Sequence, residues 1–283
     1  MNTLMKGNSP LGMIYNQSAE NIAYDSSNTV KDAIEDLKGT ACAKNGVFDG
    51  ALTKIATFNS VSDVESFLTA HNVSTGQFTG LKVGQTITIT DGTYNVDWII
   101  AGFDTNYQKG YKSSSDHPDG VTNHHIALIP KTYVTNASMN DNNVTTGGYM
   151  GSKMYTTTLP TIVTALQTVL STHLLEQCSL LTNAVTDGKS SGWTWATTAI
   201  YATLMSEANV YGSPMIGNYF DQGIDTMKLP IFNFIPTTYT GRFYFWLRSV
   251  ASASDFVDVN TYGICGTYSA SHSLGVRPLI LLG

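Results

Sequence analysis

The chain has 283 residues, a net charge of −6 at pH 7 and only 13% charged residues. Its length suits one sizeable domain with a smaller appendage, or two modest domains. The negative charge argues against a nucleic-acid-binding protein, because neutralising phosphates requires clustered Lys and Arg. Ordinary soluble domains have about 25% charged residues. Thr, Ser, Asn, Gly and Tyr replace them here, and such a surface is typical of adhesins and fibres rather than of cytosolic enzymes.

The cysteines indicate neither a disulfide framework nor a metal-binding motif. Cys42, Cys178 and Cys265 are odd in number, and none belongs to a CxxC pair. We therefore expect free thiols, with a Cys178–Cys265 bridge as the alternative. Met1–Asn21 has no apolar run typical of a secretory signal, and no stretch approaches the roughly 20 apolar residues of a membrane span. These features fit a protein that is made in the cytoplasm and assembled into a particle released by lysis.

The first predicted helix lies near the N-terminus. Gly7 and Pro10 interrupt regular structure in residues 1–27, whereas Thr29–Lys38 has an apolar stripe and Asn28 as its cap. A helix of about ten residues is not stable alone. We therefore expect it to pack on its own domain or on the same helix of other subunits.

A second helix is predicted over Asp63–His71, with Ser62 and Glu65 at capping-box spacing. Its inward-facing side chains are Val64, Phe67 and Leu68. From Lys82 onward apolar and polar residues alternate, which predicts two strands joined by a hairpin turn at Asp91-Gly92. The apolar positions of this alternation are Val83, Ile87, Ile89, Val96, Trp98 and Ile100.

The rest of the chain combines short strands, a long loop and one more helix. Ile126–Pro130 is predicted as a strand and residues 135–158 as an Asn/Thr/Gly-rich loop. A helix begins near Pro160, and the chain ends in an apolar strand over Val276–Leu282. The inward face of that helix consists of Ile162, Leu166, Val169 and Leu170. Because helices and strands do not follow a β-α-β order, the sequence predicts an α+β fold.

Arginine is confined to the final 42 residues, where Arg242, Arg248 and Arg277 lie, and all twelve lysines precede them. Since the guanidinium is a rigid planar fork, we expect these side chains to act as fixed struts. No Trp, Lys, Glu, Gln or Met follows Trp246.

This missing set has a meaning at the level of codons. Randomising the adenines of the Asn codons AAC and AAT yields a restricted alphabet of residue types, which never includes Trp, Lys, Glu, Gln or Met. Residues 251–275 fit that alphabet throughout. The alternative is a Ser/Tyr/Gly-rich loop shaped by ordinary selection.

The C-terminal sequence resembles the variable proteins of diversity-generating retroelements, especially those of gut phages. The shared frame is Trp246-Leu247-Arg248-Ser249, a mutable stretch, and Gly275-Val276-Arg277-Pro278 before an apolar strand. The resemblance spans about residues 80–283, because further blocks occur upstream in the expected order: VGQTITITDGTYNVDWIIAGFD, NHHIALIP, TTGGYMGSKM, LMSEANVYG and KLPIFNF.

The resemblance implies a C-type lectin-like domain of the subtype found in formylglycine-generating enzymes. In this family a reverse transcriptase rewrites the variable segment with errors at template adenines. Asn21–Leu37 resembles an element of phage tail-fibre and base-plate proteins that tends to precede a receptor-binding module in a trimer. The implied organisation is a short helical or extended attachment segment (residues 1–45), a linker and helix (46–80), and the lectin-like domain (81–283) with its variable region at 242–277.

Residue type and alternation separate a frame from a face within the variable region. Trp246, Arg248, Gly275 and Arg277 are expected to form the scaffold, the two arginines through hydrogen bonds to loop carbonyls. The predicted core positions are Phe245, Trp246, Leu247, Val250, Phe256, Val257, Val259 and Val276. The predicted ligand-binding face, in which Tyr gives contact area and small residues give fit, consists of Tyr244, Ala251, Ala253, Ser254, Asp255, Asp258, Tyr262, Ile264, Gly266, Tyr268, Ala270 and His272.

No metal site is predicted. His124-His125 is the most metal-like feature, but neighbouring residues in a strand point to opposite faces, so structural or exposed histidines are expected. Calcium bound by Asn140–Asn143, or by Asp116 and Asp119, is the alternative, although the spacing matches no calcium loop.

Catalysis is not expected either. Ser249 and His272 lack an oriented carboxylate. The enzymatic relatives of the fold use a pair of cysteines in the C-terminal part, where this chain has only Cys265.

The resemblance therefore implies a hypervariable ligand-binding protein without a cofactor. The expected role is that of a receptor-binding adhesin at a phage tail-fibre tip, located in the virion, or at a cell surface if it is not virion-borne. It would bind a bacterial surface protein or glycan as a homotrimer and contact other tail proteins through its N-terminus. The alternatives are a cell-surface or prophage-encoded interaction protein and a formylglycine-generating-type oxidase.

Overall fold

The computed structural model describes residues 44–107, 121–196, 200–218, 228–235 and 242–283. It also gives the backbone of two short antiparallel strands near the N-terminus, β1 (Met5–Lys6) and β2 (Ser9–Pro10). The helix expected at Thr29–Lys38, Cys42, and the pair Asp116 and Asp119 lie outside the described residues.

The fold is α+β, as the sequence predicts, and contains two main sheets. Neighbouring strands of the six-stranded sheet are antiparallel, except that β3 and β4 are parallel. In spatial order its strands are β10 (Ala202–Leu204), β15 (Pro278–Leu282), β6 (Ile126–Pro130), β5 (Val96–Phe103), β4 (Thr86–Ile89) and β3 (Lys54–Phe58).

The second sheet has five strands, and its neighbours are antiparallel except for β11 and β14. Their order is β13 (Cys265–Ser269), β12 (Asp255–Val259), β11 (Phe245–Val250), β14 (Leu274–Val276) and β7 (Thr135–Ala137). A separate hairpin is formed by β8 (Ser179–Thr186) and β9 (Lys189–Ala196).

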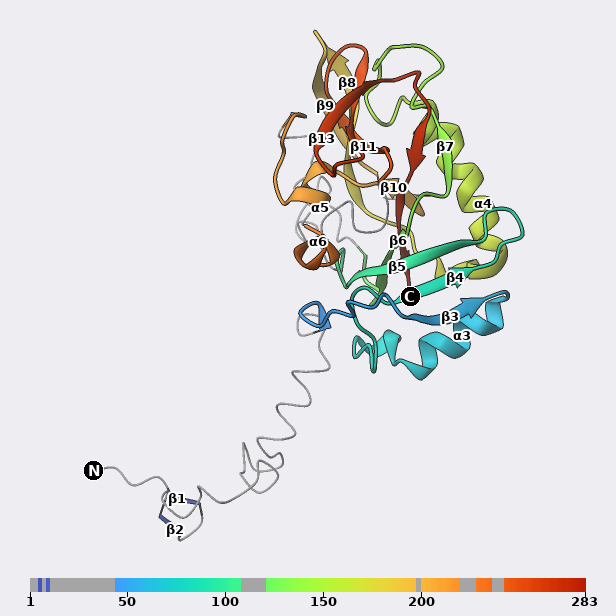
Figure 1. The fold of residues 1–283 in the computed structure, drawn as a ribbon, viewed down its shortest axis with the longest axis vertical. Helices are drawn as coiled ribbons and strands as arrows, with labels where there is room; N and C mark the ends of the chain where they lie inside the picture. Colours follow the sequence, from blue (N-terminus) through green and yellow to red (C-terminus); the bar gives the residue numbers. More distant parts are fainter. Residues whose placement is uncertain are drawn as a thin grey trace.

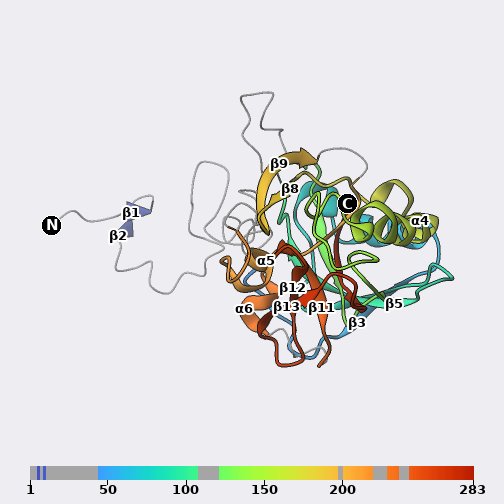
Figure 2. The ribbon, with the colours of Figure 1, turned by 90° about the horizontal axis from the view of Figure 1, so that it is seen from above.

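The helices lie on both sides of these sheets. They are α3 (Val61–Ala70), α4 (Leu159–Leu170), α5 (Glu207–Tyr211) and α6 (Ile231–Phe234), with single turns η3 (Val73–Thr75) and η5 (Ser171–His173). Figures 1 and 2 show α4 on one side of the body and α5 and α6 on the other. Among the described residues, no helix combines the length and apolarity needed to cross a membrane.

Helix α3 has the predicted inward face but a different beginning. Val64, Phe67 and Leu68 are buried as expected. The N-cap is Ser60, whose side chain accepts a hydrogen bond from the backbone N–H of Asp63, while the Asp63 carboxylate accepts one from the backbone of Ser60. The predicted cap at Ser62 and Glu65 is therefore wrong, because the upstream serine offers the same spacing to an acidic residue and makes the reciprocal pair.

Helix α4 matches the prediction more closely. It begins at Leu159, with Pro160 in its first turn, and buries Ile162, Leu166, Val169 and Leu170. The preceding π-helix η4 (Met154–Thr158) and strand β7 both lie within residues 135–158, which the sequence assigns to a loop. That assignment is wrong at these two places, because polar Thr and Asn side chains conceal elements held by backbone hydrogen bonds.

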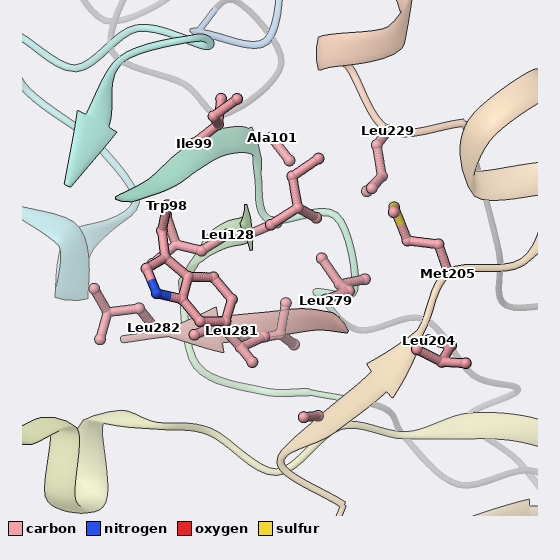
Figure 3. Packing of buried hydrophobic residues seen from close by; sticks show 14 of the residues in the cluster. Trp98, Ile99, Ala101, Leu128, Leu204, Met205, Leu229, Leu279, Leu281 and Leu282 are labelled. Carbon is pink, nitrogen blue, oxygen red and sulfur yellow. The ribbon is translucent and has the colours of Figure 1, made fainter. Parts of the chain in front are cut away.

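The larger sheet forms the centre of the hydrophobic core. Trp98 and the following residues of β5 up to Phe103 are all buried, so this strand is covered on both faces. Figure 3 shows Trp98 beside Leu128 of β6 and Leu281 of β15, which belong to neighbouring strands of the sheet. The predicted turn at Asp91-Gly92 joins β4 to β5: the Asp91 carboxylate accepts two backbone hydrogen bonds, and Gly92 has a φ of 81°.

Residues 46–80, expected to be a linker and a helix, also contribute a strand. β3 pairs with β4 in the larger sheet, and α3 packs against β3. This part of the chain therefore belongs to the folded body.

The apolar C-terminal strand predicted over Val276–Leu282 is interrupted at Arg277. β14 ends at Val276 and belongs to the five-stranded sheet, whereas β15 begins at Pro278 and belongs to the six-stranded sheet. The prediction of one strand is wrong, because proline lacks the N–H needed to continue the first ladder. Arg277 thus marks the point where the chain passes from one sheet to the other.

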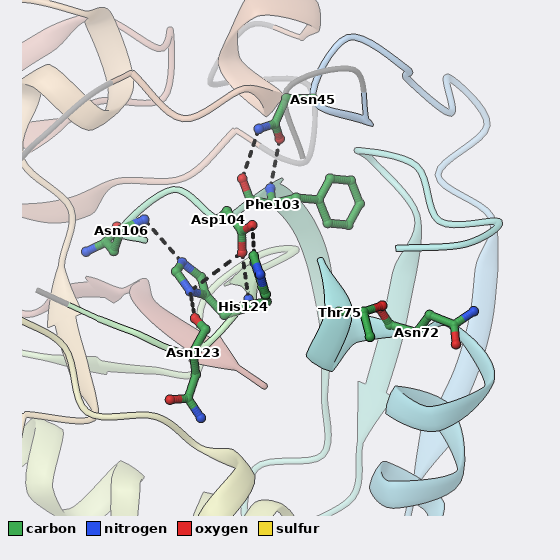
Figure 4. Close-up of polar contacts among 9 residues, drawn as sticks. Asn45, Asn72, Thr75, Phe103, Asp104, Asn106, Asn123 and His124 are labelled. Carbon is green, nitrogen blue, oxygen red and sulfur yellow. Dashed lines mark hydrogen bonds and ion pairs between the residues drawn. The ribbon is translucent and has the colours of Figure 1, made fainter. Parts of the chain in front are cut away.

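A polar cluster follows β5 and explains the histidine pair. The Asp104 carboxylate contacts His124 Nδ1 at 2.8 Å and accepts the backbone N–H of His125 at 2.8 Å, as Figure 4 shows. The buried His125 ring accepts the Asn106 N–H at Nε2 and contacts the Asn123 carbonyl through Nδ1. With one nitrogen accepting, the other carries the proton, so this ring has the structural role that the sequence predicts.

Candidate binding face

The predicted variable region, residues 242–277, builds most of the five-stranded sheet. It contributes β11, β12, β13 and β14 and their connections at 251–254, 260–264 and 270–273. In Figure 1 this sheet and the β8–β9 hairpin lie at the end of the body opposite β3 and α3. The region is therefore an end surface of the fold.

All eight predicted core positions of this region are buried. Trp246 and Phe256 have no exposed surface, and the least buried of the set is Val250 at 3%. The confirmed positions are Phe245, Trp246, Leu247, Val250, Phe256, Val257, Val259 and Val276.

Most residues of the predicted face lie at the surface, to different degrees. Tyr262 is 73% exposed, Ile264 59% and Tyr244 37%, and Ala253 and His272 are also exposed. The half-buried members are Ala251, Ser254, Asp255, Gly266 and Tyr268.

Two residues of the predicted face are not on the surface. Asp258 is 1% exposed and Ala270 has no exposed surface. Asp258 lies in β12, where the last four residues are all buried because both faces of the strand are covered. Ala270 is enclosed by main-chain hydrogen bonds with Asn140 and Ser254. Their assignment to an exposed face is wrong.

The loop that precedes η4 supports the variable connections through their main-chain atoms. Thr145 donates its backbone N–H to the Ala253 carbonyl at 3.1 Å and its hydroxyl to the Ser252 carbonyl at 2.8 Å. Asn140 donates its backbone N–H to the Ala270 carbonyl at 2.9 Å. Every residue type offers a backbone carbonyl, so these contacts survive side-chain changes at the three accepting positions.

The connection between β11 and β12 also stabilises itself. Ser252 Oγ and Ser254 Oγ both donate to the Asp255 carboxylate, at 2.6 and 3.0 Å. The hydrogen bond from Ser252 holds the pKa of the Asp255 carboxyl below its usual value, outweighing the opposing effect of burial. Asp255 and Ser254 therefore shape this loop, which reduces their availability to a ligand.

The β12–β13 turn presents two strongly exposed residues of the face, Tyr262 and Ile264. The Asn260 side-chain carbonyl accepts the backbone N–H groups of Tyr262 and Ile264, at 2.8 and 3.1 Å. Gly263 has a φ of 76°, and its carbonyl accepts the Tyr211 hydroxyl at 3.0 Å. These contacts hold the backbone of the turn, and the side chains of Tyr262 and Ile264 remain exposed to solvent.

A second group of ring side chains lies on the same face. Tyr244 contacts Tyr268 edge-on with 5.7 Å between ring centroids, and Tyr268 contacts His272 at 4.6 Å. Such edge-to-face pairs are favourable and rigid. The fold thus brings Tyr244 next to Tyr268 and His272, and all three were predicted for the face.

Sequence reasoning missed Glu207, which fixes the surface next to Ile264. It is fully buried at the start of α5, and its Oε1 accepts the backbone N–H groups of Met215, at 3.1 Å, and Ile216, at 2.7 Å. The Cys265 thiol donates to the same oxygen at 3.3 Å. This clamp places the exposed side chains of Met215 and Ile216 beside the variable strand β13. Glu207 belongs to the LMSEANVYG block, but Met215 and Ile216, whose backbone N–H groups it accepts, come after that block.

A cavity of about 280 Å³ opens beside the loop that follows α5. It lies between the β8–β9 hairpin, the loop after α5 and the end of β11. Its described lining residues are Gly188, Lys189, Ile216, Asn218, Val250 and Ala251.

The scaffold residues occupy the interior of the frame. Trp246 donates its Nε1–H to the Ala137 carbonyl of β7 at 2.9 Å. Arg277 donates Nε–H to the Pro130 carbonyl at 2.9 Å, and its guanidinium lies 5.1 Å from the centroid of the Phe245 ring. The predicted backbone hydrogen bond is present, but its acceptor is the last residue of strand β6 rather than a loop residue.

Arg277 is buried, and this burial lowers the pKa of its guanidinium to about 9. Gly275 packs so closely that an added Cβ would lie 2.8 Å from the Tyr244 carbonyl oxygen, which requires glycine. Arg248 is 3% exposed, and the expectation that its side chain binds a loop carbonyl stays a prediction.

Asp258 carries a buried carboxylate within the frame. Neither of its oxygens has a hydrogen-bond partner among the described residues, and burial raises the pKa of this carboxyl to about 6. It faces Gly266, where an added Cβ would lie 3.0 Å from Asp258 Oδ1. The ionised form is therefore destabilised in the folded protein.

Replacing Asp258 by asparagine should consequently have a pH-dependent effect on stability. The folded carboxyl keeps its proton up to about pH 6, whereas the unfolded one releases it near its usual value of about 4. Wild-type stability is thus lost as the pH rises through this window. The free energy of unfolding of Asp258→Asn, relative to wild type, should rise by roughly 2–3 kcal/mol between pH 4 and pH 8, measured by urea unfolding.

Asp255→Asn is the matched control, since the pKa of Asp255 is lowered. The stability that this carboxylate contributes is present at neutral pH and lost on acidification, so the sign of the pH dependence reverses. A difference between Asp258→Asn and wild type that does not change with pH would contradict the destabilised charge.

Cys178 and Cys265 are not joined by a disulfide, so the alternative of a bridge between them is not formed. Cys178 is buried. Burial, reinforced by Glu207 and Asp258, raises the pKa of the Cys265 thiol. A thiol that stays protonated is a poor nucleophile and a poor metal ligand.

Within the described ranges, no three His, Cys, Asp or Glu side chains come together in a group suited to a metal ion. No protein-family model matches this chain, and neither a curated protein nor a solved structure was found to be similar to it.

Proposed function

We propose that this chain is a hypervariable ligand-binding protein with a C-type lectin-like fold, acting as a phage receptor-binding adhesin for a bacterial surface molecule. The observation that carries the proposal is the separation of buried from exposed side chains in residues 242–277. The predicted core side chains are buried, and hydrogen bonds to main-chain carbonyls support the loops. The side chains of Tyr244, Ala253, Tyr262, Ile264 and His272 are exposed. A surface built in this way tolerates new side chains without loss of the fold.

The composition of the exposed set supports binding rather than catalysis. The exposed Tyr244 and Tyr262 and the half-buried Tyr268 give rigid, amphipathic contact area, and Ala251 and Ala253 are small residues in the connection between β11 and β12. This mixture resembles antibody paratopes, where aromatic residues give area at low entropic cost. The raised thiol pKa of Cys265 likewise favours a binding role over the oxidase alternative.

Assembly would strengthen such binding. A homotrimer joined through the N-terminal segment would present three faces in the same direction. Weak binding at each face then gives useful avidity on a cell surface, provided that the geometry allows simultaneous contact. In such a trimer, the N-terminal segment of each chain would also attach to other tail proteins.

A display experiment tests the tolerance on which the proposal depends. In one library, Tyr244, Ala253, Tyr262, Ile264 and His272 are randomised with the restricted alphabet of mutated Asn codons. The control library randomises the buried Phe245, Phe256, Val257, Val259 and Val276 with the same alphabet. Most clones of the first library should resist protease as well as wild type, since surface changes usually alter stability by less than about 0.5 kcal/mol. Most control clones should not.

The same libraries test binding. Selection on an arbitrary folded protein such as lysozyme should enrich binders from the first library and none from the control. The wild-type chain, labelled with a fluorophore, should stain some strains of a panel of gut bacteria and lose this staining in Tyr262→Asp. Equal loss of folding in both libraries, or an absence of binders and of stained strains, would contradict the proposal.

A further inference from the structure

The cavity beside Ala251 is built mainly by residues outside the mutable stretch. Gly188 and Lys189 come from the β8–β9 hairpin, and Ile216 and Asn218 come from the loop that follows α5. Ala251 is the one described lining residue that is predicted to vary. The cavity is therefore a fixed feature with one changeable wall position.

Hydrogen bonds hold the walls of this cavity in place. The Glu207 carboxylate accepts the Ile216 N–H at 2.7 Å, and the Asn218 side-chain amide donates to the Ser190 carbonyl at 3.4 Å. Gly188, with a φ of +72°, packs so closely on the variable loop that an added Cβ would lie 2.8 Å from Ala253 N. The loop after α5 is thus tied to α5 and to the hairpin, and the hairpin packs against the variable loop. Ligand sites are commonly preformed in this way.

The size and lining of the cavity restrict its ligand. Its volume of about 280 Å³ is at the lower limit of ligand pockets, which span roughly 300–1,000 Å³, and suits a single ring. Ile216, Val250 and Ala251 give an apolar wall, whereas Lys189 and Asn218 give a polar one. A sugar ring has this same division, with C–H bonds on its faces and hydroxyl groups at its edge.

The charge on the wall specifies the ligand further. Lys189 is exposed and bears the charged group among the described lining residues, and an ammonium group only donates hydrogen bonds. The nearby Glu207 carboxylate is already bound by the backbone amides of the loop, which disperse its charge. The cavity therefore favours a ligand with an anionic acceptor.

We propose that this cavity binds a single terminal sugar unit that carries a carboxylate, with the carboxylate at Lys189 and the ring against Ile216 and Ala251. The inference rests on the proposed function, because it assigns a glycan class to a fixed part of the same surface. Variation at position 251 then regulates access: alanine leaves the cavity open, and a large side chain closes it.

Glucuronic acid and glucose are matched probes, since they differ only in the carboxylate at C6. Binding of each to the full chain is measured by saturation-transfer NMR and by titration calorimetry. Glucuronate should bind about twofold to fivefold more tightly than glucose, as expected for one solvent-accessible ion pair. The difference should shrink with increasing salt.

Three variants connect this binding to the cavity. Lys189→Gln should lower the affinity for glucuronate to that for glucose and leave glucose unchanged. Ala251→Phe, a residue within the restricted alphabet, should abolish binding of both sugars. Lys54→Gln removes the same charge from the exposed edge strand β3 and should change neither affinity. Unchanged thermal unfolding shows that each variant is folded.

Three results would overturn the inference: equal affinity for both sugars, glucuronate binding that is insensitive to Ala251→Phe, or equally tight binding of N-acetylalanine, which has one carboxylate and no ring. The proposed function fails separately. If Tyr262→Asp removes bacterial staining while Lys189→Gln and Ala251→Phe do not, the adhesin proposal stands and the cavity is not its sugar site.

Discussion

Trp246→Ala is expected to lower the free energy of unfolding by about 4 kcal/mol, as for other fully buried aromatic residues replaced by alanine. The tryptophan has no exposed surface, and its Nε1–H reaches from β11 to the Ala137 carbonyl on β7. Because β14 lies between these two strands, the side chain joins three strands of the sheet. Its removal leaves a cavity and a carbonyl without its donor. Chemical denaturation, monitored by far-UV circular dichroism, measures the loss.

Trp246→Phe separates the two contributions. Phenylalanine fills most of the ring space but lacks the N–H, so this variant should lose only about 1–2 kcal/mol, the cost of an unmade buried hydrogen bond. If Trp246→Ala were as stable as wild type to within 1 kcal/mol, the sheet would not depend on this residue. The frame described above would then be wrong.

The parts of the fold that follow from local sequence were predictable. The inward face of α4 could be read from apolar residues at helical spacing, and Trp98 and Ile100 from alternation. The beginning of α3 was not, because Ser60 and Ser62 are each followed three residues later by an acidic residue. Only the packed structure decides which serine becomes the cap.

The candidate face was harder to predict, because its limits depend on contacts distant in sequence. Asp258 was assigned to solvent as a polar residue in a strand, yet both faces of β12 are covered. Glu207 is 58 positions away from Cys265, whose thiol it binds, and no spacing rule connects the two residues. The break at Arg277 was missed for a similar reason, since an apolar run does not reveal that its two halves join different sheets.

A matched pair of aspartate substitutions tests the separation of frame and face most directly. Phe256→Asp places a charge at a position with no exposed surface, whereas Tyr262→Asp places it at one that is 73% exposed. Phe256→Asp should destabilise the protein by about 4–5 kcal/mol or prevent folding, because the carboxylate loses its hydration and the apolar ring is lost. Tyr262→Asp should change the free energy of unfolding by less than about 0.5 kcal/mol.

Only one of the two variants gives information on binding, because only one of them keeps the fold. Phe256→Asp loses binding through unfolding, which circular dichroism detects. Tyr262→Asp keeps the fold, since Asn260 and Tyr211 hold its turn through the backbone of Tyr262, Gly263 and Ile264 rather than through the tyrosine side chain. A loss of bacterial staining in this variant would therefore report the contact itself. If Tyr262→Asp instead destabilised the protein by more than about 2 kcal/mol, the exposed residues would be carrying the fold, and a surface that does so is unsuited to continual rewriting.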